Sequence, residues 1–263
     1  MQFDRSYWRH ARYGVLMAIA CACFTSPALS QTVTVASGAS FVLGAGTLTT
    51  GCGDVNVAGQ FQVGSGTVTG TNNVSISGGT LDGGSGLVSL SGNWSNAGTF
   101  VPGSGSVQIV DGCGATESQI TGDNTFAAFS ANSGTGKQLT IASSSTQTFN
   151  NALSLTGASG NRLLVRSSTP GSSAAFVLKP GASQTIQSVD VSDNDASGGE
   201  TIAPDVPSAF DSVRGKNILN WFMEIAPPIP VDTLPLPALL ALIALVGLAL
   251  RRKLPSTRAA HNA

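Results

Sequence analysis

Side chains that could do chemistry are few in this chain, and the densest group of them is acidic. Asp190, Asp193 and Asp195 lie close together in the sequence. Carboxylates at this spacing could bind Ca²⁺ or act as a general acid and base. The spacing lacks the glycine and the final glutamate of an EF-hand loop. We therefore expect no metal ion and no cofactor, and we keep these three aspartates as the single candidate Ca²⁺ site.

Two arginines are further candidates for binding. Arg162 and Arg166 could hold the carboxylate of an acidic sugar, because a guanidinium pairs well with a carboxylate. No carboxylate cluster lies beside them in the sequence, which favours ordinary surface positions.

Histidine is almost absent. The chain has only His10 and His261, which lie near its two ends. The long region between them therefore has no Ser-His-Asp or Cys-His catalytic group and no histidine-bound metal. We predict that the protein is not an enzyme.

An internal repeat indicates the elements that must position these side chains. Gly-X-Gly triplets begin at Gly44, Gly64, Gly84 and Gly103, so that they recur at a nearly constant interval. A large apolar residue stands three positions before each triplet and another stands two positions after it. These residues are Phe41, Phe61, Leu81 and Phe100, followed by Leu48, Val68, Val88 and Val107. Such a period is the signature of a repeat architecture.

A repeat of about 20 residues suits the coils of a parallel β-helix, in which each coil holds two or three short strands. Alternation along residues 55–63 places the valines and Phe61 inward and Asn56 and Gln62 outward. We predict an all-β fold, a parallel β-helix or solenoid over residues 31–222. An antiparallel sandwich or barrel, with turns every 8–12 residues, is the alternative.

The strand pattern loosens after residue 110 but continues, with further strands expected at 138–141, 152–155, 162–165, 175–178 and 185–189. The stretch from Asn93-Trp94 through Phe126 resembles a repeat of bacterial surface and adhesin-like proteins. Residues 189–222 resemble the closing segment of such proteins. The resemblance implies a role at a surface and names no ligand.

Two cysteines, Cys52 and Cys113, lie within the repeat region. Export to an oxidising compartment favours a disulfide between them. The repeat favours free thiols. The two cysteines are separated by roughly three coils, and strands stack about 4.8 Å apart. Equivalent positions would then be roughly 14 Å apart, beyond bridging distance. Both outcomes stay open, and we lean toward unbridged cysteines.

Residues 1–30 have the layout of a secretory signal peptide. Arg5, Arg9 and Arg12 form a basic segment, residues 13–24 are apolar, and small residues lead to Ser30. We predict cleavage after Ser30. A retained signal anchor and a lipoprotein signal with its lipid on Cys21 are the alternatives.

The C-terminal region has the layout of a membrane anchor. Residues 234–250 are apolar apart from prolines, and Arg251, Arg252 and Lys253 follow them. Seventeen helical residues would span about 25 Å, the short end for a membrane helix. Basic residues hold that end in the cytoplasm. We predict a Pro-rich linker at 223–233, a transmembrane helix at 234–250 and a cytoplasmic tail at 251–263. A buried helix of a soluble domain is the alternative.

This region resembles an IPTL-type C-terminal sorting domain, whose motif reads Ile/Val-Pro-Thr-Leu-Ser-Glu-Trp-Gly/Ala-Leu before an apolar helix and terminal arginines. The positions that match are Val231, Thr233, Leu234, Ala238 and Leu239. Asp232 replaces the motif proline, and residues 235–237 replace Ser-Glu-Trp. PEP-type tails are similar as well. The resemblance implies recognition and cutting by an exosortase-like membrane protease of a Gram-negative envelope.

Charge narrows the list of partners. Residues 31–230 carry twelve acidic and six basic side chains, and residues 31–110 carry no basic one. No patch there could neutralise phosphates, which excludes nucleic acid. The expected partners are the membrane, the processing protease and extracellular polysaccharide.

These features together predict an exported structural or adhesin-like protein of the cell surface or extracellular matrix. It would use the general secretory route and be held first in the inner membrane with its domain in the periplasm. Processing would then move it to the surface or release it. The alternative is a carbohydrate-active β-helix enzyme, either a polysaccharide lyase or a hydrolase.

Overall fold

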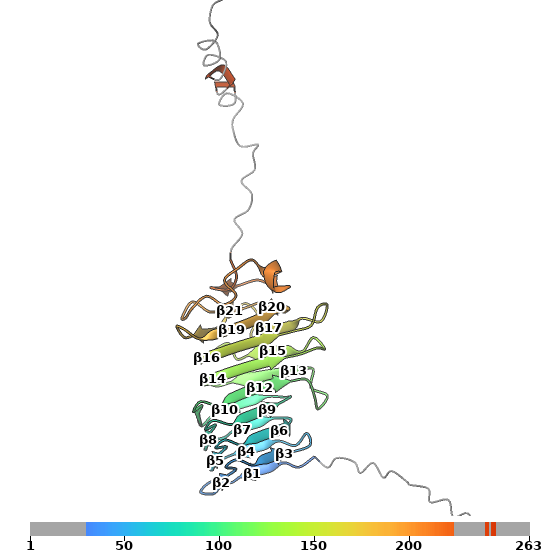
Figure 1. Ribbon diagram of the computed structural model, residues 1–263, viewed down its shortest axis with the longest axis vertical. Helices are drawn as coiled ribbons and strands as arrows, with labels where there is room; N and C mark the ends of the chain where they lie inside the picture. Colours follow the sequence, from blue (N-terminus) through green and yellow to red (C-terminus); the bar gives the residue numbers. More distant parts are fainter. Residues whose placement is uncertain (1–29, 224–239, 242, 246–263) are drawn as a thin grey trace, which may run out of the picture.

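The structure is a computed structural model that describes residues 30–223, 240–241 and 243–245. Residues 30–223 form a parallel β-solenoid whose strands stack along one axis (Figure 1). Every pairing between named strands is parallel. The prediction of an all-β parallel β-helix is thus confirmed, and the antiparallel alternative is wrong.

Three sheets form the sides of the solenoid. Sheet A contains β1 (Val33–Val35), β4 (Val55–Val57), β7 (Val74–Ile76), β10 (Trp94–Asn96), β13 (Glu117–Thr121), β15 (Gln138–Ile141), β17 (Leu163–Ser167), β20 (Val189–Val191) and β22 (Val213–Arg214). Sheet B contains β2 (Ser40–Val42), β5 (Gln60–Gln62), β8 (Thr80–Asp82) and β11 (Thr99–Val101).

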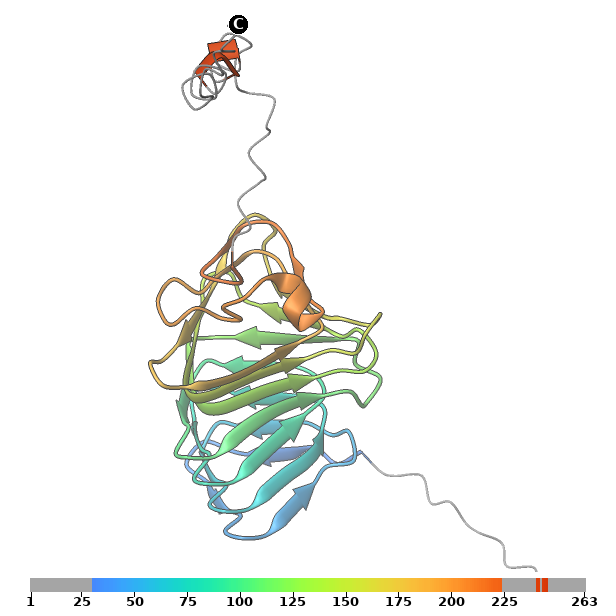
Figure 2. The ribbon, with the colours of Figure 1, turned by 45° about the horizontal axis from the view of Figure 1, so that its top comes forward.

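Sheet C is the third side. It contains β3 (Thr47–Thr49), β6 (Thr67–Thr71), β9 (Leu87–Leu90), β12 (Ser106–Val110), β14 (Asn124–Asn132), β16 (Thr146–Thr156), β18 (Ala174–Leu178), β21 (Asn194–Asp195) and β23 (Ile218–Leu219), with β19 (Ser183–Gln187) paired to β16. Figure 2 shows the chain winding around a continuous interior.

Coil length changes along the solenoid. Val55 lies beside Val74 of the next coil, whereas Trp94 lies beside Ile120, so the later coil takes up a longer stretch of chain. The period predicted from the glycine triplets therefore describes the first coils but not the later ones. Sheet B ends after the fourth coil. In the later coils the long strands β14 and β16 each extend over two sides of the solenoid. The register between these two strands shifts between Phe126 and Ala128.

Alternation fills the interior. Val55, Val57, Phe61 and Val63 are all buried, as predicted. Aromatic side chains continue the core upward from Trp94 through Phe126 and Phe149 to Trp221, each in contact with the next aromatic ring of the column. One coil cannot bury its own inner face, so stacking supplies the burial that stabilises every coil.

The C-terminal end of the solenoid is closed by irregular chain. The 3₁₀-helix η1 (Pro207–Phe210) lies over the last coils, and Phe210 packs against Phe222. Ile202 forms an isolated parallel bridge with Trp221. These segments cover the apolar interior at the end where Met223 leaves the fold (Figure 1).

A disulfide joins Cys52 to Cys113, so the leaning toward free thiols is wrong. The two Cα atoms are 5.4 Å apart. The larger separation expected from the repeat assumed that both cysteines occupy equivalent places in their coils. The loop after β12 instead leaves its coil, passes Gly112 beside Ser91 and reaches down to Cys52. The coil register stays intact, because β3, β6, β9 and β12 still pair in order.

Most of the predicted termini fall outside this description. No helix in the described part of the chain is long and apolar enough to cross a membrane. Residues 240–241 and 243–245 are helical. Ser30 is described and exposed. The signal peptide before it lies outside the described residues, as do the sorting-motif positions Val231, Thr233, Leu234, Ala238 and Leu239 and the basic cluster Arg251, Arg252 and Lys253.

Candidate functional site

A polar groove runs across the outer face of sheet A in the later coils. Its volume is about 560 Å³. Its charged lining residues are Arg166 from β17, Asp190 from β20, and Asp193 and Lys216 from the turns that follow. Gln138 from β15 adds an amide. Outward positions of neighbouring parallel strands line up side by side, which is why residues distant in sequence meet here.

Arg166 and Asp190 form the floor of this groove. Leu164 is in register with Asp190, so Arg166 reaches back diagonally across the two strands. Its Nη2 lies 3.0 Å from Asp190 Oδ1. Its Nη1 donates to the Asp190 carbonyl oxygen at 2.6 Å and to the Val165 carbonyl oxygen at 2.9 Å. The pair is about a quarter exposed, so a ligand would meet a guanidinium and a carboxylate that already neutralise each other.

The three candidate Ca²⁺ ligands do not converge. Asp193 lies in a left-handed turn and accepts a hydrogen bond from Asn217 Nδ2 at 3.0 Å. Asp195 belongs to β21 of sheet C, where its Oδ1 accepts from the Ser197 N–H at 2.8 Å. Within the described residues, no three His, Cys, Asp or Glu side chains are grouped to hold a metal ion.

Arg162 lies apart from the groove. Its Nη2 pairs with Asp211 Oδ1 at 2.9 Å, and its Nε donates to the Asp211 carbonyl oxygen at 2.8 Å. The Ser188 hydroxyl donates to Asp211 Oδ2 at 2.7 Å. The hydrogen bond from Ser188, followed by that from Arg162, holds the pKa of Asp211 below its usual value. These contacts fasten the turn after η1 to the coil below, which is a structural role.

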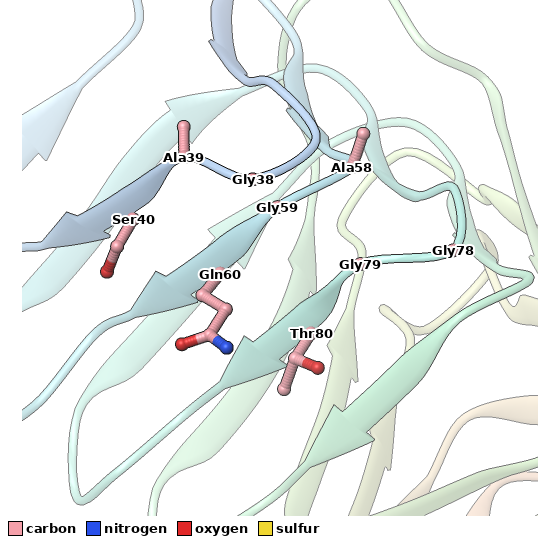
Figure 3. A pocket seen from close by; sticks show the side chains of 9 residues that line it. All are labelled: Gly38, Ala39, Ser40, Ala58, Gly59, Gln60, Gly78, Gly79 and Thr80. Carbon is pink, nitrogen blue, oxygen red and sulfur yellow. The ribbon is translucent and has the colours of Figure 1, made fainter.

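A second, uncharged groove of about 390 Å³ lies at the N-terminal end beside sheet B. Figure 3 shows Ser40, Gln60 and Thr80 on successive strands β2, β5 and β8 along its wall. These residues are in register. The corner residues, among them Gly59 and Gly79, carry no side chain that would fill the space. This groove presents hydroxyl and amide groups and no charge.

No family model, no curated protein and no solved structure matches this chain. Its function is therefore inferred from its own residues and geometry.

Both carboxylates of the sheet A groove already have partners among neighbouring side chains. Glycoside hydrolysis needs one carboxylic acid and one further carboxylate on either side of the scissile bond. Here the Asp190 carboxylate is held by Arg166, and that of Asp193 by Asn217. Lys216 adds a cation to the lining, whereas Gln138 Nε2 already donates to Glu117 Oε1 and Thr140 Oγ1. The lining therefore presents charges of both signs together with polar groups.

The most unusual charged group was not found by the sequence reasoning. Lys137 is fully buried, and its Nζ donates to the Ser91 carbonyl oxygen and, at 3.3 Å, to Ser118 Oγ. Burial lowers the pKa of Lys137, and the nearby Asp111 opposes this only in part. The only sequence signal is that Lys137 directly precedes the strand Gln138–Ile141, a position that an exposed lysine would occupy equally well.

Proposed function

We propose that the protein is an exported structural or adhesin-like component of the cell surface or extracellular matrix. The observation that carries this proposal is the single rod-like stack of coils, with nine strands in sheet A and ten in sheet C. Solenoids of this kind present long surfaces and act as spacers, since each coil contacts only its neighbours. The Cys52–Cys113 disulfide supports an oxidising compartment.

The proposed membrane anchor would attach at one end of this rod. The described solenoid ends at Met223, shortly after β23, and β23 is the terminal strand of sheet C at the end opposite to β3. If residues 234–250 cross the inner membrane, the chain is held at its C-terminal end and the coil containing β1, β2 and β3 is the distal tip. Cutting near the sorting-motif positions would then release or transfer the rod without altering it.

Fractionation of cells with mass mapping of the mature termini tests this proposal. We expect a chain that begins at Gln31 and that is found in the envelope or medium. We also expect the sorted form to end near residues 231–239. An intact tail through Ala263 in the inner membrane would leave a plain anchor and remove the sorting step. A chain that begins at Met1 and stays in the cytoplasm would overturn export itself.

Two variants separate anchoring from sorting. Replacing Arg251, Arg252 and Lys253 with Gln removes the basic cluster that orients a membrane helix. Replacing Thr233 and Leu234 with Ala leaves that cluster but alters the matched motif. We expect the first variant to change membrane retention and the second to change only the position or amount of cutting.

The second candidate function is action on an acidic polysaccharide, because the sheet A groove places the cations Arg166 and Lys216 beside the carboxylates of Asp190 and Asp193. A lyase would release chains with unsaturated sugar ends, and a hydrolase would release new reducing ends. We expect binding without either product. Product formation by the full-length protein that is lost in Asp190→Asn would establish the enzyme instead.

A further inference from the structure

Among the residues that the structure describes, the N-terminal end of the solenoid is an open edge on all three sides. β1, β2 and β3 are the terminal strands of sheets A, B and C, and each pairs with a strand on one side only. An edge strand of this kind presents a row of unpaired N–H and C=O groups and is a template for pairing with another chain.

The backbone directions can be assigned from the ladder. The Leu43 N–H donates to the Gln62 carbonyl oxygen, and the Gln60 N–H donates to the Ala39 carbonyl oxygen. Residues 39 and 43 of this segment therefore face β5. In a strand the N–H and C=O groups of alternate residues point to opposite sides, so Val42 directs its N–H and C=O toward the open end. Thr34 does the same on β1, because Val33 faces β4.

The side chains at this end are only partly covered. Phe41 and Leu48 are partly buried against the core, whereas their partners in the next coil, Phe61 and Val68, are each 1 % exposed. Apolar side chains at these inward positions are thus fully buried where a further coil lies on them. Stacking a further layer on the first coil would remove this apolar surface from water, which is favourable.

Within residues 30–223, none of the usual protection of an exposed edge is present at this end. Residues 30–53 contain no Asp, Glu, Lys, Arg, His or Pro. Natural edge strands are normally blocked by charges, prolines, bulges or a covering segment. The opposite end of the same molecule differs, because its terminal strands β22 and β23 are only two residues long and Arg214 and Lys216 carry charges in or beside them.

We propose that this open end, consisting of β1, β2 and β3, binds the same end of a second copy of the chain. A two-fold axis lying across the end reverses the direction of each strand, so facing strands meet antiparallel and can pair. This axis places one strand of the end opposite the same strand of the second copy. It places each of the other two strands opposite the other one. All three strands are three residues long, so every side meets a strand of equal length. Two uncharged edges also meet without repulsion.

A second copy fits this end better than other occupants do. A single added strand would cover one side and leave the other two open. Head-to-tail stacking fits less well, because the terminal strands β22 and β23 at the other end are only two residues long and the charged residues Arg214 and Lys216 lie in or beside them. The contact is therefore closed and joins two rods tip to tip. Such a contact would connect rods displayed on facing cells, and this consequence rests on the proposed surface function. The pairing of the two ends does not depend on that function.

The test uses the full-length protein, purified in mild detergent, with its mass measured by sedimentation over a range of concentrations. Val42→Pro removes an N–H that faces the open end and leaves the ladder to β5 intact. Val42→Lys adds a charge beside the edge. Val101→Lys is the matched control, because Val101 occupies the equivalent place three coils away and is similarly exposed, at 42 % against 60 %. We expect a dimer for the unaltered chain and the control, and at least tenfold weaker association for both Val42 variants.

Hydrogen exchange assigns the contact to the tip. We expect amide exchange in residues 31–49 to slow as the concentration rises in the unaltered chain and to stay constant in Val42→Pro. A monomeric unaltered chain, or a dimer that all variants retain with no change in exchange at 31–49, would overturn the proposal. A monomer that keeps residues 1–29 covering the tip would overturn it as well. Fractionation decides surface display separately, so the two proposals can fail independently.

Discussion

The disulfide between Cys52 and Cys113 links the turn after β3 in the first coil to the loop after β12 in the fourth coil. Both residues lie in the left-handed region of backbone conformation. The bond closes a loop of 61 residues that contains all of sheet B from β5 onward. The end with the open edge is therefore covalently tied to the coils above it, which limits fraying at the place where packing is weakest.

Replacing both cysteines with serine should lower the free energy of unfolding by about 4 kcal/mol, since a 61-residue loop in the unfolded chain is no longer constrained. Chemical denaturation of the oxidised protein and of the double variant measures this. Reduction of the unaltered protein is the control and should give the same loss. Peptide mapping without reduction should recover both cysteines in one linked species, and separate peptides would contradict the assignment.

Gly78 and Gly79 are adjacent glycines that are required for different reasons. Gly78 has a φ of +89° and open space around it, whereas a Cβ on Gly79 would run into the Gly59 carbonyl oxygen. Gly78→Ala should cost about 1–2 kcal/mol, and Gly78→Asn less, because asparagine tolerates left-handed backbone. Gly79→Ala should cost about 1–3 kcal/mol or more by forcing the coils apart, and Gly79→Asn should cost more still. Thermal unfolding of the four variants decides this, and rescue of position 79 by asparagine would contradict it.

A buried polar ladder ties three coils together around Asn124. Trp94 Nε1 donates to Asn124 Oδ1 at 2.9 Å, and Asn124 Nδ2 donates to Gln147 Oε1 at 2.9 Å. Asn124→Leu should lower stability by about 2–6 kcal/mol, because it leaves two buried partners unsatisfied at about 1–3 kcal/mol each. Asn150→Leu, at an exposed position of β16, is the matched control and should change stability by less than about 0.5 kcal/mol. Equal losses in the two variants would show that Asn124 contributes no special contact.

The fold could be predicted because one local rule repeats. The spacing of Gly44, Gly64 and Gly84 fixes the coil length, and alternation fixes which side chains face inward, as Phe61 shows. The coils after residue 110 could be recognised as strands, but their greater length could not be derived. There β14 and β16 merge two sides, and the loops between strands vary in length without any period.

The contacts that depend on loops escaped the sequence. Cys113 reaches Cys52 only because its loop leaves the coil, and no repeat position encodes that path. The sequence named Asp190 and Asp193 as candidate Ca²⁺ ligands and both Arg162 and Arg166 as candidate sugar contacts, and only the structure shows that Arg166 shares a groove with the two aspartates while Arg162 lies apart. Two arginines so close together are equivalent in the sequence, and only the register of β17 with β20 separates them.

Lys137 should make stability depend on pH in the alkaline range. Burial lowers its pKa in the folded protein below the ordinary value of 10.5, so between those two values the unfolded chain binds more protons than the folded one. The free energy of unfolding should therefore rise with pH across that window, by up to about 1.4 kcal/mol per pH unit for one proton, and level off above 10.5. Denaturation at a series of pH values measures the slope. Lys137→Met should abolish it, whereas Lys179→Met, at an exposed position, should leave it unchanged. A slope that survives in Lys137→Met would assign it to another group.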